Sequence, residues 1–176
     1  SGLALGPHTE APYWCAVNAK AGHSPSPSSL ILSALWNPSL EATRIIALPP
    51  ILEKIGVTNC LALTTGNFQF TRSDSFVRGK GEDGRNVSIL EFDDKIGFAA
   101  RFNSYRFSVN DNASHFVKAA YAALCQGVGE ATPAQYTLTQ ETALVINNVR
   151  ALHCRDVIRD NSRVLVRTFG LSKFST

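Results

Sequence analysis

The sequence lacks several features that would place it in a specialised class of protein. Its 176 residues contain no apolar run of membrane-spanning length, no internal repeat and no low-complexity tract. Charge of one sign is also scarce, because the net charge is only +3 and the basic residues are scattered along the chain. The missing apolar run argues against a membrane partner, and the mild, dispersed charge argues against a nucleic-acid partner.

Cysteine is sparse as well, and its spacing does not indicate a metal site. The sequence contains neither a CxxC motif nor the paired spacing that is typical of a zinc site. We therefore expect free thiols, as in proteins of the reducing cytoplasm. The four cysteines are Cys15, Cys60, Cys125 and Cys154.

The remaining composition is that of a soluble globular protein, with 44% hydrophobic and 18% charged residues. A chain of this length is expected to form one domain, residues 1–176, around a substantial core. Its apolar runs are short and separated by turn residues, which predicts many strands and few helices. The expected fold is mainly β, an antiparallel sandwich or double-stranded β-helix (jelly roll) with one or two flanking helices.

Two helices are expected within this pattern. The first covers residues 51–55 and follows a Pro-Pro pair, which can begin a helix but cannot lie inside one. The second covers residues 113–126, where apolar positions recur at helical spacing, and Gly127 is expected to end it. The other apolar runs predict strands over residues 29–36, 40–48, 59–65, 67–71, 87–92, 97–102 and 136–138.

Two further apolar runs, residues 142–146 and 149–153, flank the pair Asn147-Asn148. Asparagine tolerates a positive φ, so this pair predicts the tight turn of a β-hairpin. His153 ends the second run and is the first candidate for a functional residue.

A polar loop over residues 156–162 separates this hairpin from another apolar run, which carries Arg163 and Arg167. Side chains alternate along a strand, so residues four apart lie on the same face. We expect both arginines to face the cavity into which His153 points. The alternatives are a solvated strand face for the arginines and, for His153, a core histidine bonded to the backbone.

The tripeptide His8-Thr9-Glu10 supplies the partner that His153 needs. In a strand, His8 and Glu10 lie on one face and Thr9 on the other. Two imidazoles and one carboxylate form the ligand set of non-heme iron(II) oxygenases. A buried arginine beside such a metal can bind the far carboxylate of a keto acid through two hydrogen bonds. The alternative for this pair is an exposed polar segment.

The loop over residues 11–28 is long, contains three prolines and carries the aromatic pair Tyr13-Trp14. Long loops near a site are commonly functional, so we expect a lid that brings both aromatic side chains to the substrate. The alternative is that the pair serves only in packing. His23 in this loop and His115 on the second expected helix are expected to be surface residues.

These segments together resemble the catalytic part of the iron(II)/2-oxoglutarate dioxygenases of the clavaminate synthase-like group, relatives of taurine dioxygenase. The tripeptide at residues 8–10 matches the group's His-x-Glu. Residues 148–153 fit its Asn-x-Arg-x-x-His pattern, with Cys154 where relatives often have glycine. Residues 35–43 are similar to a strand and turn leading to a threonine that contacts 2-oxoglutarate, and residues 67–76 to an aromatic-rich strand.

The resemblance implies a role for each candidate residue and a reaction. Enzymes of this group couple the oxidative decarboxylation of 2-oxoglutarate to succinate with attack on a substrate C–H bond, by default hydroxylation. The substrate that it implies is an amino acid or a small peptide-like metabolite. The implied roles are iron(II) binding by His8, Glu10 and His153, binding of the distal 2-oxoglutarate carboxylate by Arg163 with Thr43, and binding of an acidic substrate group by Arg167.

The main departure from the group lies before residue 8, where only seven residues stand in place of a long segment. Because that segment forms part of the substrate wall, we expect either a truncated chain or a wall supplied by a homo-oligomer or second subunit. The competing hypothesis is a jelly-roll binding or assembly module without turnover. The alternative role for Thr43 is that of an ordinary strand residue.

Overall fold

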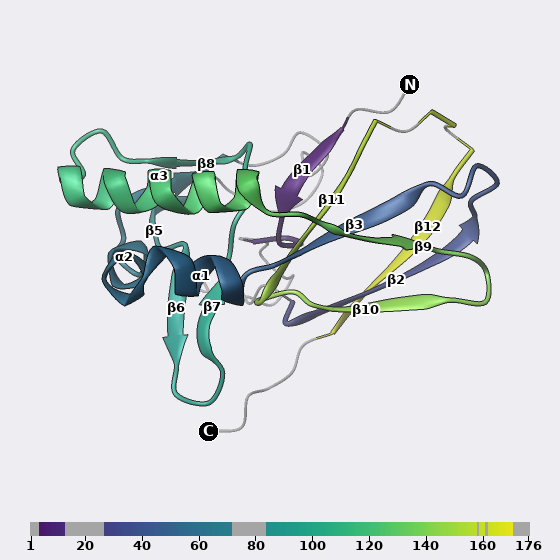
Figure 1. The fold of residues 1–176 in the computed structure, drawn as a ribbon, viewed down its shortest axis with the longest axis horizontal. Helices are drawn as coiled ribbons and strands as arrows, with labels where there is room; N and C mark the ends of the chain where they lie inside the picture. Colours follow the sequence, from purple (N-terminus) through teal and green to yellow (C-terminus); the bar gives the residue numbers. More distant parts are fainter. Residues whose placement is uncertain (1–3, 13–26, 72–83, 158, 161, 171–176) are drawn as a thin grey trace.

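The computed structural model describes residues 4–12, 27–71, 84–157, 159–160 and 162–170. Helices gather at one end of the molecule and the long strands at the other (Figure 1). In the ranges described, no helix is both long enough and apolar enough to cross a membrane. The fold is mainly β, with antiparallel pairing between all paired strands of these ranges.

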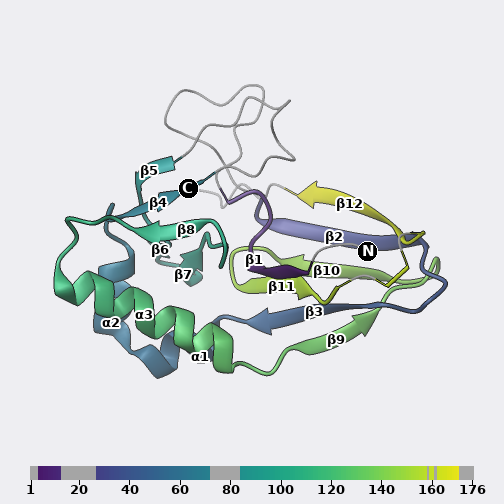
Figure 2. The same ribbon diagram turned by 90° about the horizontal axis from the view of Figure 1, so that it is seen from above.

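The long strands form two sheets, which we call the sandwich half. One sheet has the strand order β1-β11-β3-β9 and the other β10-β2-β12, and both are visible from above in Figure 2. Buried residues alternate along β2, as expected for a strand with one face toward a core. The strands are β1 (Leu5–His8), β2 (Ser29–Trp36), β3 (Ala42–Ala47), β9 (Ala134–Thr137), β10 (Ala143–Asn147), β11 (Ala151–Arg155) and β12 (Val164–Gly170).

The other end, which we call the helical half, contains the larger apolar core. Its helices are α1 (Pro49–Ile55), α2 (Val57–Leu63) and α3 (His115–Glu130). They lie beside two small sheets, β5-β4-β8 and β6-β7. The strands of these sheets are β4 (Phe68–Phe70), β5 (Gly84–Val87), β6 (Leu90–Asp93), β7 (Gly97–Ala100) and β8 (Phe107–Val109).

Several local predictions are confirmed. The strand expected over residues 29–36 is β2, and the helix expected over 51–55 is α1, which has proline in its first turn and is followed by Gly56. Three other confirmed runs contain shorter strands than expected: β3 within 40–48, β4 within 67–71 and β7 within 97–102. β10 matches the run 142–146 with a shift of one residue, β9 overlaps 136–138, and the run 87–92 is divided between β5 and β6.

The second expected helix exists but differs at both ends. It begins after Ser114, whose hydroxyl accepts a hydrogen bond from the Val117 backbone N–H at 3.3 Å. Gly127 does not end it and is buried inside α3. A Cβ atom at Gly127 would lie 2.7 Å from Ile51 Cγ2. This glycine therefore permits the close approach of α1 to α3 rather than a helix end.

The strand expected over residues 59–65 is wrong, because this run forms helix α2. A short apolar run does not by itself distinguish a strand from a buried helix. Two of its three buried residues, Cys60 and Leu63, are spaced as on one helix face, and both belong to the core that α3 also lines. Packing against α3 decides the conformation, and the described chain has three helices instead of one or two.

The hairpin expected at Asn147-Asn148 is also wrong. β10 pairs with β2, whereas β11 pairs with β1 and β3, so the two strands belong to different sheets. Neither asparagine has a positive φ. The turn after β10 carries the chain from one sheet to the other instead of reversing it within a sheet.

Candidate metal centre and its pocket

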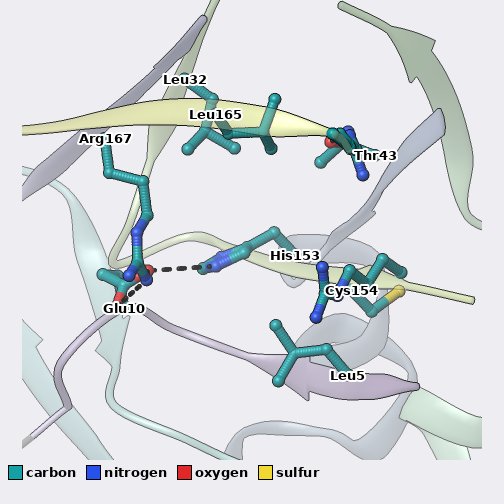
Figure 3. Close-up of a pocket in the computed structure, with 10 residues that line it drawn as sticks. Leu5, Glu10, Leu32, Thr43, His153, Cys154, Leu165 and Arg167 are labelled. Carbon is teal, nitrogen blue, oxygen red and sulfur yellow. Dashed lines mark hydrogen bonds and ion pairs between the residues drawn. The ribbon is translucent and has the colours of Figure 1, made fainter. Parts of the chain in front are cut away.

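A pocket of about 270 Å³ lies between the two sheets of the sandwich half. Side chains from both sheets line it, and Figure 3 shows them converging from opposite ribbons. The lining residues that carry the argument below are Glu10, Thr43, His153, Arg155, Arg163 and Arg167.

Two histidines and one carboxylate meet beside this pocket, which His153 and Glu10 line. In the pairing of β1 with β11, His8 lies opposite His153, and their ring centroids are 4.0 Å apart. His153 Nε2 lies 3.5 Å from Glu10 Oε2. Each of the three residues offers a ligand atom within 4.8 Å of the others, and all three side chains are buried. The structure thus brings together the three residues that the sequence pattern selected.

Glu10 lies just beyond the end of β1, so the single strand expected over residues 8–10 is too long. Thr9 fixes this point of the chain through three hydrogen bonds to Phe102, one of which Thr9 Oγ1 donates to the Phe102 carbonyl at 3.3 Å. The Thr9 backbone N–H donates to the Phe102 carbonyl at 2.7 Å, and Thr9 Oγ1 accepts from the Phe102 N–H at 3.0 Å. These contacts direct the Thr9 side chain toward Phe102, while the Glu10 carboxylate lies beside His153.

Asn148 holds the Glu10 backbone from the opposite side. Its Oδ1 accepts from the Glu10 N–H at 2.7 Å, and its Nδ2 donates to the carbonyl oxygens of Glu10 at 3.1 Å and Pro27 at 2.7 Å. The side chain is 1% exposed. Sequence reasoning gave this residue a role only in a turn, although its place in the Asn-x-Arg-x-x-His pattern was a usable signal. Asn148 is a positioning residue for Glu10.

The surroundings set the charge of two of the three candidate ligands. Burial, and then the charge of His153, lowers the pKa of His8 to about 4. His8 Nδ1 donates to the Gly6 carbonyl at 2.8 Å in that neutral form, which leaves Nε2 as the ring nitrogen with a free lone pair. Burial raises the pKa of Glu10, but the hydrogen bond from His153 and the charge of Arg167 outweigh it and lower the pKa to about 2. A neutral imidazole and an ionised carboxylate are the forms that bind a metal.

The two arginines expected at the cavity both line the pocket. Arg163 Nη2 donates to Thr43 Oγ1 at 3.0 Å, and Thr43 is buried. Arg167 Nη1 lies 3.2 Å from each Glu10 oxygen, as Figure 3 shows. Thr43 lies toward the opposite end of the pocket from Glu10 (Figure 3). The two guanidinium groups therefore serve different ends of one pocket.

Some of the sequence predictions concern residues outside the described ranges. Tyr13, Trp14 and His23 lie there, so the lid over residues 11–28 stays a prediction. His115 is exposed at the start of α3, as expected. Of the four cysteines, Cys15 lies outside these ranges and the other three are free thiols, as expected.

Comparison with known proteins finds this fold among solved oxygenases. No family model matches the chain, and no curated protein matches it in sequence. The non-heme iron oxygenase OrfP in complex with Fe, succinate and (3S)-hydroxy-L-Arg is 24% identical, with a TM-score of 0.76 over 98% of this chain and 51% of that one. The complex of OrfP with Fe and alpha-ketoglutaric acid is 22% identical, with a TM-score of 0.75 over 98% of this chain and 51% of that one.

An asparagine oxygenase in complex with Fe(II), 2S,3S-3-hydroxyasparagine and succinate is 18% identical, with a TM-score of 0.74 over 97% of this chain and 51% of that one. The chain thus spans about half the length of the solved structures that it matches. These likenesses establish a fold shared with iron oxygenases. The resemblance drawn from the sequence is confirmed at that level.

Proposed function

We propose that the chain is the catalytic part of an iron(II)- and 2-oxoglutarate-dependent oxygenase with a double-stranded β-helix (jelly roll) fold. The observation that carries the proposal is the meeting of His8, Glu10 and His153 beside one pocket, which Glu10 and His153 line. We propose further that residues 1–176 form one domain of a cytoplasmic protein without a nucleic-acid or membrane partner.

The donor set fits iron(II). Ligands that each lie about 2.0–2.2 Å from a shared ion can be at most about 4.4 Å apart, if iron resembles zinc in bond length. The 3.5 Å between His153 Nε2 and Glu10 Oε2 is within that limit. Two imidazoles and one carboxylate on one side leave the pocket side open for other ligands. With O2 as the oxidant and 2-oxoglutarate as the co-substrate that is decarboxylated, iron(II) bound here would supply the oxidising chemistry that no side chain of the chain can supply.

The residues of the pocket would bind and orient the two organic molecules. Arg163, already held by Thr43, would pair with the distal carboxylate of 2-oxoglutarate through its planar fork of N–H groups. Arg167 would bind an acidic group of the substrate. Its side chain is 55% exposed, so it has room to turn from Glu10 toward a substrate.

What the solved relatives bind supports the proposed substrate class. Their complexes contain hydroxylated arginine and hydroxylated asparagine. An amino acid or a small peptide-like metabolite is therefore the proposed substrate, and hydroxylation of a C–H bond is the proposed outcome. Tyr13 and Trp14 are proposed to contact it. We also propose that a homo-oligomer or a second subunit completes the pocket wall.

The test is to add iron(II) and 2-oxoglutarate without oxygen and to record the weak visible charge-transfer band. We expect the wild-type chain to give the band and, once oxygen is admitted, succinate. Glu10→Ala should give neither, whereas Glu91→Ala should behave as wild type, because Glu91 pairs with Arg101 on the surface. A band without succinate would indicate the inactive binding module, and no band at all would refute the metal site.

Replacing each of the two arginines should have a different effect on the kinetics. Arg163→Ala is expected to raise the 2-oxoglutarate requirement sharply, because no other single side chain restores a bidentate pairing with the same geometry. Arg167→Ala should leave uncoupled 2-oxoglutarate turnover largely intact and weaken the response to substrate. If Arg167→Ala rather than Arg163→Ala loses 2-oxoglutarate affinity, the two roles are exchanged.

A further inference from the structure

A third arginine lines the pocket and has no place in the roles described so far. Arg155 ends β11, two residues after His153. Residues two apart in a strand lie on the same face, so both side chains leave β11 toward the pocket. The two positions are separated by about 6.6–6.8 Å along the strand. β11 thus carries a candidate metal ligand and a guanidinium in line along one wall.

The strand register places Arg155 beside Thr43. β11 pairs with β3 through His153 opposite Ile45 and Cys154 opposite Arg44. Continued by one residue, that antiparallel register brings Arg155 next to Thr43. Thr43 is the residue to which Arg163 donates its hydrogen bond. Arg155, Thr43 and Arg163 therefore gather at the end of the pocket away from Glu10.

Neither guanidinium at this end has an ion pair within the described part of the chain. The Nε atoms of Arg155 and Arg163 are buried and have no hydrogen-bond partner there. Glu41 is a carboxylate whose charge acts on both groups. Glu41 Oε1 already accepts from the backbone N–H groups of Arg159 at 2.7 Å and Asp160 at 3.2 Å.

Two partly buried cations that share no ion-paired carboxylate form a site for an anion. Such charges are poorly stabilised without a partner, so a bound carboxylate is favoured. A 2-oxo diacid bound at the candidate metal ligands through its 2-oxo acid end would carry its distal carboxylate toward these two guanidinium groups. A 2-oxo monoacid lacks the second carboxylate that would pair with these groups.

We propose that Arg155 is a second binding residue for the distal carboxylate of the co-substrate, acting with Arg163. This inference rests on the proposed function and deepens it. The pair makes the pocket selective for a 2-oxo acid with a second carboxylate, because a monoacid leaves both guanidinium groups without a partner.

The test measures binding of two 2-oxo acids to the manganese(II)-loaded chain by calorimetry, without turnover. We expect Arg155→Ala to weaken 2-oxoglutarate by about ten- to a hundredfold, as for the loss of hydrogen bonds to a charged group. Pyruvate, which lacks the distal carboxylate, should bind as weakly to the variant as to wild type. Arg155→Lys, which keeps the charge but not the fork, should recover part of the loss.

The matched control is Arg44→Ala, since Arg44 pairs with Asp156 and does not line the pocket. It should bind both acids as wild type does. Unchanged 2-oxoglutarate binding in Arg155→Ala, or an equal loss for both acids, overturns the inference and leaves the proposed function standing. If Arg155→Ala fails to fold, Arg155→Lys takes its place. Weaker binding of 2-oxoglutarate but not of pyruvate by Arg155→Lys supports the inference. Binding of both acids that is unchanged, or weakened equally, contradicts it. A wild-type chain that binds manganese but not 2-oxoglutarate overturns the proposed function as well.

Discussion

The two halves of the molecule differ in what fills their interiors. The helical half holds a continuous apolar cluster that includes Leu63, Phe68 and Leu124, each 1% exposed or less. The sandwich half has a much smaller apolar cluster, formed by Leu30, Leu32, Ala34, Leu138 and Ile146. The buried polar side chains of the described ranges are His8, Thr9, Glu10, Thr43, Asn148 and His153, all close to the pocket.

This difference indicates a division between stability and function. Burying apolar surface stabilises a fold, whereas buried polar groups stabilise it little and are costly when unpaired. The helical half is therefore expected to supply most of the free energy of folding, and the sandwich half to place polar groups for chemistry. Substitutions in the core of the helical half should affect stability more than metal affinity. Substitutions near the pocket should affect both.

The largest expected effect on stability comes from the core of the helical half. Leu124→Ala should lower the free energy of unfolding by about 2–5 kcal/mol, because it removes buried contacts and leaves a cavity. Manganese affinity of the folded protein should not change. Phe116→Ala on the same helix is the control, since Phe116 is 49% exposed and its loss should cost within about 0.5 kcal/mol. A parallel fall in metal affinity in Leu124→Ala would show that the halves are not separable.

Asn148→Ala should give an intermediate loss of stability together with a loss of metal affinity. It leaves the Glu10 N–H without its buried acceptor, so the free energy of unfolding should fall by about 1–3 kcal/mol. Manganese affinity, measured by calorimetry, should fall by about ten- to a hundredfold, as for a residue that orients a ligand. Asn147→Ala removes a neighbouring exposed amide and should leave the affinity unchanged. Equal manganese affinities in the two variants would show that Asn148 does not position Glu10 for metal binding.

The smallest expected effects concern two glycines of α3 and should have opposite signs. Gly127→Ala places a Cβ atom 2.7 Å from Ile51 Cγ2, so overpacking should lower stability by about 1 kcal/mol or somewhat more. Gly129→Ala meets nothing within 4 Å and should raise stability by about 0.5–1 kcal/mol through helix propensity. Urea unfolding of the two variants checks this. A stabilising Gly127→Ala would mean that α1 yields easily and that the helical half is loosely packed.

Local signals were sufficient for part of the fold. Alternation located β2, and the Pro-Pro pair and Gly56 located α1. They failed for residues 59–65, where a short apolar run fits strand and helix equally, and packing against α3 made it a helix. They failed again at Asn147-Asn148, because a local pattern predicts a chain reversal but not whether the flanking strands share a sheet.

For the site, the sequence by itself determined the chemical types: the His-x-Glu pair, the second histidine and the two arginines four residues apart. Such patterns depend on side-chain alternation over a few residues, and local geometry fixes that. Only the tertiary structure decided that His8 lies opposite His153, that Asn148 holds Glu10 from 138 positions away and that Arg155 joins Arg163 at one end of the pocket. These contacts join residues far apart in the chain, and they form only when strand pairing and core packing are satisfied throughout the molecule.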